Sequence, residues 1–409
     1  MIKIHQKILN TTVLAALTLW AAPSFAQANL TLTLPGGSTK VDSFTWGVTQ
    51  TIAVEPSRMY AGKVVFDDLT WTQKYGPNVP TLLSNQFTGK AFAGTFTSND
   101  SETGAALSLS AQKFLLGSIS TSGTGVTGSV KFDDITLSYK PNSGVKALNP
   151  VVTTQLNLGT GTFTGLDKRL QPPSKDPKTD AALNGETSIY LRLGGNSGDV
   201  IAGDSNATGY ENWIKLNTAQ FSFTTPNSIS RAAGLVTGKT VASGIEWTQD
   251  LDGSIPAALT RLAKGKSFSG ATLEFVTSGV AGPVTFMQMA MTDVFLKSFA
   301  LSSDSTGTEI RESLVFGAFS QTAWDIKDDG TRGQSTSFAW NILENKAASA
   351  SLAKNIADFG NGNLSPSAVA LAVSLPPITP VPEPETYAML LVGLGLIGGV
   401  LKRRKANCI

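Results

Sequence analysis

The sequence predicts a mainly β protein made of two tandem small β-barrel domains, each with one short helix. Three observations predict this fold class. Charged residues make up only 15% of the chain and hydrophobic residues 41%, which is enough apolar material to bury a core. Glycine is abundant, with 40 residues, and the apolar runs are short and bounded by glycine, serine and proline, as strands are. Blocks of sequence also recur at a nearly constant spacing, which indicates a duplicated domain.

The N-terminal 26 residues have the pattern of a secretory signal peptide. Lys3 and Lys7 give a positive start, residues 13–20 form a short apolar stretch, and Ala26 completes a small-residue cleavage site. We expect signal peptidase to cleave between Ala26 and Gln27, so that this segment is removed. The alternative, an uncleaved membrane anchor, is disfavoured because the apolar stretch is short for a membrane span.

The C-terminus has the pattern of a short membrane segment between two polar signals. Residues 386–401 are apolar, and these sixteen residues would make a helix of about 24 Å, against a hydrocarbon core of about 30 Å. The cations that follow would hold the tail on the cytoplasmic side of a membrane. They are Lys402, Arg403, Arg404 and Lys405. Just before the apolar segment lie Pro382, Glu383 and Pro384.

This order of parts resembles the PEP-CTERM sorting signal, here over 381–409. The resemblance implies that an exosortase recognises the Pro-Glu-Pro motif at 382–384 and removes the tail after transient anchoring in the inner membrane. It also implies a Gram-negative bacterium that makes exopolysaccharide, and a final location at the cell surface or in the extracellular matrix. An ordinary tail anchor with a chance Pro-Glu-Pro is the alternative.

The mature body lacks the side chains that many active sites use. The single histidine is His5, in the leader, and the single cysteine is Cys408, in the tail. If both ends are removed, the body has no Cys or His metal ligand, no thiol nucleophile and no imidazole base. The net charge of +2 includes the four C-terminal cations, so the body lacks the basic face that nucleic acid requires. We therefore expect no enzyme activity, no cofactor, no metal and no nucleic-acid partner.

Two segments of the body repeat each other. Residues 69–73 (LTWTQ) recur as 245–249 (IEWTQ), and 89–94 (GKAFAG) recur as 265–270 (GKSFSG), each 176 residues later (245 − 69 = 176). Small insertions shift this spacing elsewhere, as surface loops do in duplicated domains. The offset becomes 180 where 114–119 matches 294–299, and 177 where Phe44-Thr45-Trp46 matches Phe221-Ser222-Phe223.

Within each copy the pattern predicts strands and one helix. Residues 30–34 alternate leucine with threonine, as a half-buried strand does. Residues 79–87 and 255–262 each contain or follow proline and stop near Gly89 and Gly265, which indicates one short helix per copy.

The domain boundaries follow from the repeat and from the segments between its copies. We expect a first domain at 27–161 and a second at 188–346. Residues 162–187 are polar and contain the proline-rich stretch QPPSKDP, which is typical of a linker. Residues 347–380 form a second linker that leads to the sorting signal.

Several repeated features carry a resemblance to a known family. They are a strand ending at 44–47 (FTWG), Gly62-Lys63-Val64 before a strand containing Asp68-Leu69-Thr70-Trp71, a helix opened by 77–83 (PNVPTLL), a strand ending at 116–121, and 338–342 (FAWNI) late in the second copy. These features resemble the Hcp family, the secreted tube protein of type VI secretion systems. The resemblance covers 30–158 and 188–346. It implies a β-barrel with one helix that stacks as six-membered rings into a hollow tube.

The chain departs from that family in its organisation. Tube-forming members are single domains without a signal peptide, whereas this chain has a signal peptide, a sorting tail and two copies. The resemblance therefore implies the fold, and the tube function does not transfer intact.

Two groups of acidic residues are candidate sites with a plainer structural alternative. Asp325, Asp328, Asp329 and Gly330 form an acidic turn that could bind Ca²⁺, although Asp-Gly is a common hairpin turn. The pairs at 67–68 and 133–134 could serve glycoside hydrolysis. They are Asp67-Asp68 and Asp133-Asp134, and the second copy has Ser243-Gly244 and Gly317-Ala318 in their places, which favours a solvated strand face.

Tryptophans are the candidate sugar-stacking residues. Trp71 and Trp247 occupy equivalent places in the two copies, which favours core packing over a binding surface. The full set is Trp46, Trp71, Trp213, Trp247, Trp324 and Trp340.

These observations together predict a non-catalytic exported protein of the cell envelope or extracellular matrix. A glycan-binding protein of the exopolysaccharide is the alternative, and a carboxylate-dependent hydrolase is a third interpretation. The expected partners are signal peptidase, exosortase and further copies of the chain. Because each chain would contribute two tethered domains, three chains could form a ring of six domains. The 162–187 linker spans roughly 25–31 Å as a random coil, which suits neighbouring placement.

Overall fold

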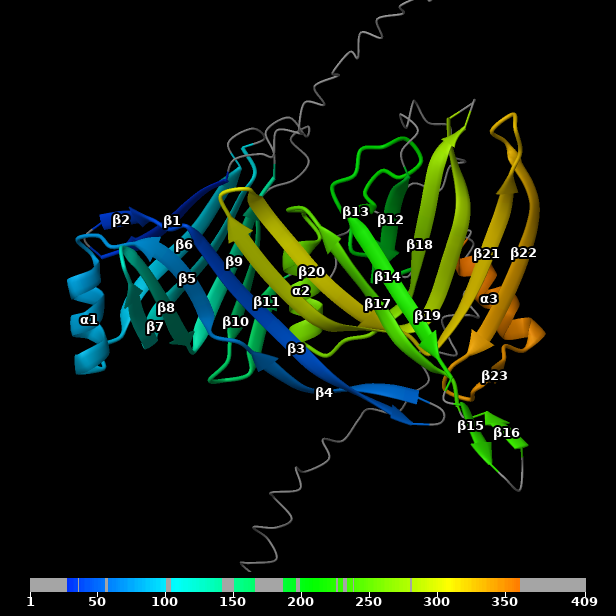
Figure 1. Ribbon diagram of the computed structural model, residues 1–409, viewed down its shortest axis with the longest axis horizontal. Coiled ribbons are helices and arrows are strands. Elements are labelled where there is room, and N and C mark those ends of the chain that lie inside the picture. Colours follow the sequence, from blue (N-terminus) through cyan, green and yellow to red (C-terminus); the bar gives the residue numbers. More distant parts are fainter. Residues whose placement is uncertain are drawn as a thin grey trace, which may run out of the picture. The chain divides into compact units, whose positions relative to one another are not determined.

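A computed structural model of the chain is shown in Figure 1. It describes residues 28–35, 37–55, 58–100, 104–141, 151–165, 187–195, 199–225, 227–230, 234–237, 239–279 and 282–360. Contacts divide the chain into a unit over 1–365 and a second unit over 366–409. All described residues belong to the first unit, and the fold is mainly β, as the sequence predicts.

The described residues of the first half of this unit form eleven strands and one helix. They are β1 (Ala28–Leu34), β2 (Gly37–Lys40), β3 (Ser43–Glu55), β4 (Arg58–Phe66), β5 (Leu69–Lys74), α1 (Val79–Thr88), β6 (Phe92–Asp100), β7 (Ala106–Ser122), β8 (Gly125–Phe132), β9 (Asp134–Lys140), β10 (Val152–Asn157) and β11 (Thr162–Gly165). Antiparallel pairing gives the order β2–β1–β6–β7–β8–β5–β3, and β7 also begins the branch β7–β9–β10–β11. The strand β4 pairs with the far half of β3.

The second half repeats this arrangement and adds a third helix. Its elements are β12 (Ser188–Leu193), β13 (Ile214–Leu216), β14 (Thr218–Thr224), β15 (Asn227–Ser230), β16 (Gly234–Thr237), β17 (Val241–Gln249), α2 (Ile255–Ala263), β18 (Phe268–Gly279), β19 (Gly282–Asp304), β20 (Gly307–Val315), β21 (Ala318–Ile326), β22 (Arg332–Asn341), β23 (Lys346–Ala347) and α3 (Ala350–Gly360). Pairing gives β13–β12–β18–β19–β20–β17–β14 and the branch β19–β21–β22–β23. This order is the same as in the first half, except that β4 has no paired counterpart among the described strands of the second half, where β15 and β16 pair with each other. We call residues 28–165 the first copy and 187–347 the second copy.

One sequence match between the copies is wrong by two residues. In the first copy Phe44 pairs with Trp71, and in the second copy Ala219 pairs with Trp247. The offset between β3 and β14 is therefore 175 (219 − 44 = 175), and not 177 as expected. Trp46 thus corresponds to Phe221. The predicted alignment still matched inward-facing residues of β3 with inward-facing residues of β14, because side chains alternate between the two faces with a period of two along a strand.

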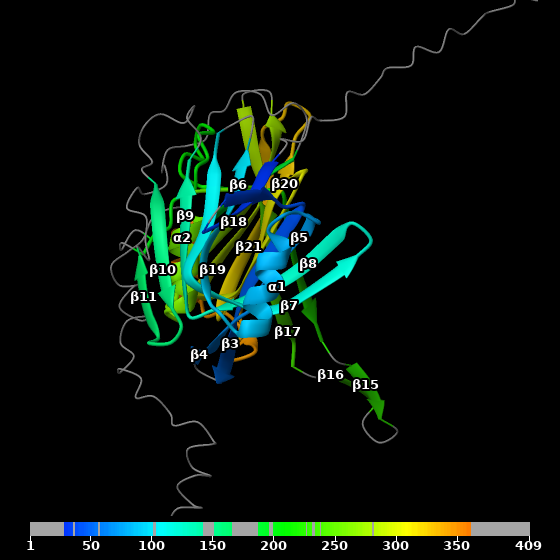
Figure 2. The ribbon, with the colours of Figure 1, turned by 90° about the vertical axis from the view of Figure 1, so that its left-hand side faces the viewer.

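The predicted barrel closure is not observed. Among the described strands, β2 and β3 end the ordered sheet of the first copy without pairing with each other, and β13 and β14 do the same in the second copy. The fold class is therefore an open, strongly branched antiparallel arrangement, and the barrel expectation is not confirmed. Among the described strands, β15 and β16 pair only with each other, and they project as a hairpin in both views (Figure 1 and Figure 2).

The two predicted helices are present where the sequence places them. Both carry proline in the first turn, where a missing N–H costs nothing. α1 ends at Gly89, whose φ of 62° allows the left-handed turn, and Gly265 follows α2 with a φ of 61°. Backbone bonds from Lys90 to Asn85 and from Lys266 to Arg261 close the two ends in the same way.

Each expected linker contains described residues that form regular structure. The strand β11 occupies 162–165, the start of the first expected linker, because it pairs with β10. The helix α3 lies inside the second, at 350–360, and buries Ile356 against Ala290 and Ala318. No helix in the described part of the chain has the length and apolarity needed to cross a membrane.

Candidate functional site at the joint between the two copies

The residues predicted to direct sorting all lie outside the described residues. These are Ala26 and Gln27 at the signal cleavage site, Pro382, Glu383 and Pro384 in the motif, and Lys402, Arg403, Arg404 and Lys405 in the tail. Their roles remain predictions. The apolar segment at 386–401 lies outside the described residues as well.

The acidic turn is a hairpin turn in the structure. Asp329 accepts hydrogen bonds from the backbone N–H and the hydroxyl of Thr331, at 2.9 and 2.6 Å, and these lower the pKa of its carboxyl. Gly330 has a φ of 72°, and Lys327 N–H bonds to Thr331. No group of three metal-ligating side chains occurs among the residues described.

The acidic pairs of the first copy face lysines on neighbouring strand positions. Lys131 Nζ lies 3.5 Å from Asp68, and Lys113 Nζ lies 4.0 Å from Asp133, with all four side chains substantially exposed. Burial and the adjacent Asp133 raise the pKa of Asp134. These contacts fit the solvated strand face that the sequence favours.

The tryptophans divide into a buried and a partly exposed group. Trp71 and Trp247 are buried, and each indole N–H donates to a glutamine two residues on, at 3.1 and 2.8 Å. Trp46 and Trp213 are buried too. Trp324 and Trp340 are partly exposed, and Arg332 lies over the Trp324 ring at 4.5 Å.

The feature that the sequence did not show is a joint between the two copies. Strand β3 of the first copy pairs antiparallel with β19 of the second, from Ser43 opposite Asp304 to Thr49 opposite Ser298. The ring of Trp46 lies 6.0 Å from that of Phe299, edge to face, across this pairing. One hydrophobic core includes buried residues of both copies, so they form a single packed body.

Helix α2 forms the second part of the joint. It belongs to the second copy but packs on β9, β10 and β11 of the first, as Figure 1 and Figure 2 show. Every residue of α2 is buried, whereas only Val79 and Leu82 are buried in α1. The Thr154 hydroxyl of β10 donates to the Pro256 carbonyl at 2.7 Å and lies 2.8 Å from the Thr260 hydroxyl.

Further polar contacts cross the joint. Gln50 Nε2 donates to the Leu262 carbonyl at 3.2 Å, at the end of α2. Ser303 Oγ donates to Ser98 Oγ at 3.0 Å. The Tyr139 hydroxyl donates to Asp204 Oδ2 at 2.9 Å. Buried polar groups with partners of this kind specify one arrangement of the two copies.

Three carboxyl groups gather beside the N-terminus of α2. Asp204 accepts from Gly253 N–H at 2.7 Å, and Asp252 accepts from the N–H groups of Asp204 and Ser254, each at 2.7 Å. Burial, together with the charge of Asp204, raises the pKa of Asp252 to about 7. Burial and the charge of Asp252 raise the pKa of Glu312 to about 8. Among the described residues, Glu312 Oε2 has no hydrogen-bond partner.

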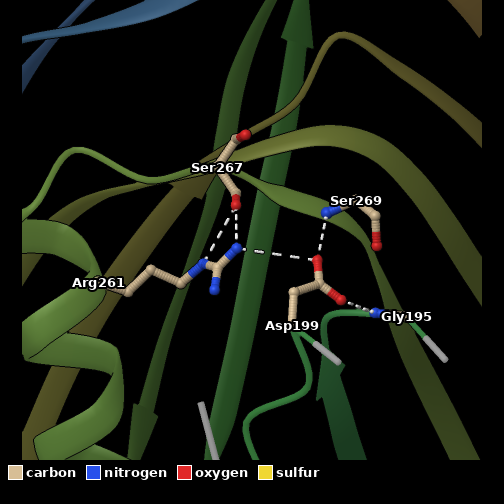
Figure 3. A network of polar contacts seen from close by, with 5 residues as sticks. All are labelled: Gly195, Asp199, Arg261, Ser267 and Ser269. Atoms are coloured by element: carbon tan, nitrogen blue, oxygen red, sulfur yellow. Dashed lines mark hydrogen bonds and ion pairs between the residues drawn. The ribbon is translucent and has the colours of Figure 1, made fainter. Parts of the chain in front are cut away.

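A second network holds the far end of α2 (Figure 3). Arg261 donates from Nε to the Ser267 carbonyl at 3.1 Å, and its Nη2 also bonds to that carbonyl and lies 3.8 Å from Asp199. Asp199 accepts from the backbone N–H groups of Gly195 and Ser269, at 2.7 and 2.6 Å. The network joins the loop after β12 to the start of β18, so its charges are used in holding structure.

Sequence reasoning missed the joint because its residues carry no motif. Thr154, Gln50 and Ser98 are ordinary strand residues in the sequence. The one signal was the contrast between the two helices: α2 reads IPAALTRLA and α1 reads VPTLLSNQFT, so α2 has alanine where α1 has Thr81, Leu82 and Phe87. Small residues on every side of a helix indicate burial on every side.

Comparisons with known proteins identify two regions of the chain. Residues 190–325 match the family model described as Type VI secretion system effector, Hcp. Residues 380–405 match the model of the PEP-CTERM protein-sorting motif. No curated protein matches the chain.

Solved Hcp structures are similar to part of the chain. Hcp1 from Salmonella typhimurium is 18% identical, with a TM-score of 0.32, over 40% of this chain and 99% of that one. A type six secretion system protein is 19% identical, with a TM-score of 0.35, over 40% of this chain and 100% of that one. Secreted protein Hcp3 from Pseudomonas aeruginosa is 14% identical, with a TM-score of 0.27, over 38% and 99%. The chain thus contains an Hcp-like region at 190–325 and carries a PEP-CTERM protein-sorting motif at 380–405.

Proposed function

We propose that this chain is an exported, non-catalytic structural protein of the cell envelope or extracellular matrix, built from two Hcp-like domains and processed by an exosortase. The observation that carries the proposal is the presence of an Hcp-like region and a PEP-CTERM motif in one chain. The first implies a structural module, and the second implies export and a membrane-anchored precursor. The proposed domains are 27–161 and 188–346, between the signal peptide and the sorting signal.

The chemistry of the joint supports a structural role. The perturbed carboxyl groups, Asp252 and Glu312, are buried and sit beside α2 and Trp247 inside the second copy. The charged pair of Arg261 and Asp199 is bonded to backbone groups. These groups hold elements together, and a substrate would need them to be accessible.

Processing is tested by mass spectrometry of material from the cell surface. We expect a mature N-terminus at Gln27 and no peptide from 402–409. Glu383→Ala should leave the full-length precursor in the inner membrane, because the exosortase motif is lost. Glu385→Ala, two residues on, is the matched control and should be processed normally. An intact C-terminus in surface material would disprove exosortase processing.

Self-assembly is the second part of the proposal: three chains form a ring of six domains. The copies inside one chain already lie side by side, joined through the different surfaces β3 and β19, so the joint is head to tail. Light scattering on residues 27–380 measures the mass in solution. A mass of three chains is expected, and a monomer at high micromolar concentration would exclude a stable ring.

A glycan-binding role is the alternative, and one observation favours it. Phe338 and Trp340 stack at 5.9 Å on β22 and are at least partly exposed, although Trp340 also packs against the core. Aromatic faces of this kind bind sugars by stacking. Retention on the organism's own exopolysaccharide that is lost in Phe338→Ala, with unchanged mass in light scattering, would favour this role over self-assembly.

A further inference from the structure

We propose that three carboxyl groups at the joint, those of Asp204, Asp252 and Glu312, form a pH-sensitive switch that keeps the two copies tightly joined when it is protonated and loosens the joint when it is ionised. This goes beyond the proposed function, because it concerns how one folded chain responds to the pH around it. Three features carry it: the burial of the carboxyl groups, their contacts with the other copy, and the residues that the first copy has in the same places.

Glu312 is an acidic residue on the core face of β20. Ile310, Glu312 and Leu314 alternate along this strand, and all three are buried. Trp247 of β17 and Phe299 of β19 lie directly opposite Glu312 in the two pairings of the strand, so aromatic residues flank it on both sides. Its Oε2 atom has no hydrogen-bond partner among the described residues. In such surroundings the neutral carboxyl is much less costly than the charged one.

The charged groups that act on this cluster are themselves acidic. The charge of Asp252 acts on Glu312, and the charge of Asp204 acts on Asp252. The nearest charged residues of the strands around Glu312 are exposed to solvent: Glu246 of β17, Lys297 of β19 and Arg311 of β20. Burial and the neighbouring acids therefore raise the pKa of Asp252 to about 7 and the pKa of Glu312 to about 8.

Asp204 connects the cluster to the first copy. It lies in the loop between β12 and β13, and its Oδ2 atom accepts hydrogen bonds from the Tyr139 hydroxyl of β9 at 2.9 Å and from the Gly253 N–H at 2.7 Å. Its own N–H donates to Asp252 Oδ2 at 2.7 Å, and Asp252 Oδ1 accepts from the Ser254 N–H at 2.7 Å. The same two carboxyl groups thus hold both the bond from the first copy and the start of α2.

The first copy builds the same helix start without an acid. Asp252 corresponds to Gly76 in the first copy (252 − 76 = 176). The first N–H of each helix bonds to the carbonyl of that residue, from Val79 at 3.1 Å and from Ile255 at 3.2 Å. The turn that opens the helix therefore forms equally well with glycine, and the Asp252 carboxyl serves another purpose.

Glu312 also has a glycine in its place in the first copy. Trp71 pairs with Gly128 as Trp247 pairs with Glu312. A Cβ atom on Gly128 would lie 2.3 Å from two ring atoms of Trp71, so that indole rests directly on the glycine. Both indoles still donate to a glutamine two residues on, so the tryptophan site forms with or without the acid. Both acids thus belong to the copy whose helix is enclosed by the joint.

The direction of the pH effect follows from the state in which water reaches the carboxyl groups. When the joint opens, their pKa values return to the ordinary value of about 4. The open state therefore binds fewer protons than the closed state between about pH 4 and pH 8, and raising the pH through this window favours opening. Ionised Asp252 and Glu312 would repel Asp204, and moving the loop of Asp204 away from β9 relieves this and breaks the Tyr139 bond.

Hydrogen exchange of the purified full chain, read by mass spectrometry at pH 5.5 and pH 7.5, measures the opening of each element. After correction for the intrinsic pH dependence of amide exchange, the opening constants of α2 and β9 should rise at least about ten-fold, since each linked carboxyl contributes up to about ten-fold per pH unit. α1 is the internal control, because its copy has glycine in both places, and it should change less than about two-fold. An equal rise in α1 and α2, or no rise in α2, overturns the proposal.

Variants separate a pH-sensitive switch from an ordinary buried contact. Glu312→Gln keeps the shape of the side chain and cannot ionise, so the rise in α2 should shrink at least about three-fold. Glu309→Gln, at an exposed position of the same strand, should behave like the parent. Tyr139→Phe removes the bond to Asp204, so α2 and β9 should open more readily at both pH values while the pH dependence remains. A Glu312→Gln chain with the parent's pH dependence, or a Tyr139→Phe chain with the parent's opening constants, would show that the switch is wrong.

Discussion

At the scale of single residues, Glu312 is a buried group whose protonation the fold controls. It is buried in β20 opposite Trp247, where burial and the nearby charge of Asp252 raise its pKa from the ordinary 4.5 to about 8. Asp252 behaves in the same way, with a pKa of about 7 against 3.8. Between the unfolded and folded values the folded state binds more protons, so stability falls as pH rises through this window.

The pH dependence of unfolding tests this account. We expect the free energy of unfolding to fall by roughly 1–3 kcal/mol between pH 5 and pH 9. In Glu312→Gln, which cannot ionise, the fall should be smaller and the variant should be the more stable one at pH 9. Glu309→Gln, an exposed position in the same strand, should keep the parent's pH dependence. Identical curves for all three proteins would refute the assignment.

Thr154 is the residue on which the polar contact between the copies centres. Its hydroxyl meets both the carbonyl of Pro256 and the hydroxyl of Thr260, in a site closed to water. Thr154→Val keeps the shape and removes the hydroxyl, so we expect a loss of about 1–2 kcal/mol in chemical denaturation. Thr153→Val, the exposed neighbour, should cost less than about 0.5 kcal/mol. Equal costs at the two positions would show that the contact contributes nothing.

At the scale of elements, the two helices show how one local sequence pattern serves two environments. Both carry proline in the first turn and are followed within two residues by a glycine of positive φ, so their boundaries are set locally. α2 is covered on every side because β9, β10 and β11 of the other copy pack on it, whereas α1 keeps an open face.

Truncation at equivalent helix positions measures this difference. Leu259 of α2 is fully buried, and its equivalent Leu83 in α1 is half-buried. We expect Leu259→Ala to cost about 2–5 kcal/mol of unfolding free energy, as core truncations do. Leu83→Ala should cost clearly less, because its side chain loses fewer contacts. A larger cost at Leu83 would contradict the packing described for α2.

At the scale of the whole molecule, the described residues form one body with a shared core. Strand pairing, helix packing and polar contacts all cross between the copies, so neither copy can unfold without exposing the core of the other. We expect residues 27–380 to unfold in a single transition, with far-ultraviolet circular dichroism and tryptophan fluorescence coinciding. Two separated transitions would indicate that the two copies are stable independently of each other, as two domains connected only by a linker would be.

The sequence by itself determined the features that local chemistry controls. The mainly β class, the duplication and the two helices followed from turn residues, short apolar runs, proline and glycine. The PEP-CTERM motif and the likeness to Hcp were also readable, because contiguous residues carry them. The alignment of β3 with β14 that the sequence predicted was wrong by two residues. A shift of two residues along a strand keeps each side chain on the same face of the sheet, so the alternation of apolar and polar residues cannot reveal the error.

Only the tertiary structure decided how the copies meet. The pairing of β3 with β19 joins residues more than 200 positions apart through backbone hydrogen bonds. Every residue type has the backbone groups that make these bonds, so no pattern of side chains in the sequence predicts the pairing. The burial of Thr154 and the exposure of its equivalent Phe338 depend in the same way on what lies opposite each strand. Local sequence sets which way a side chain points, and the neighbouring chain segment sets whether it is buried.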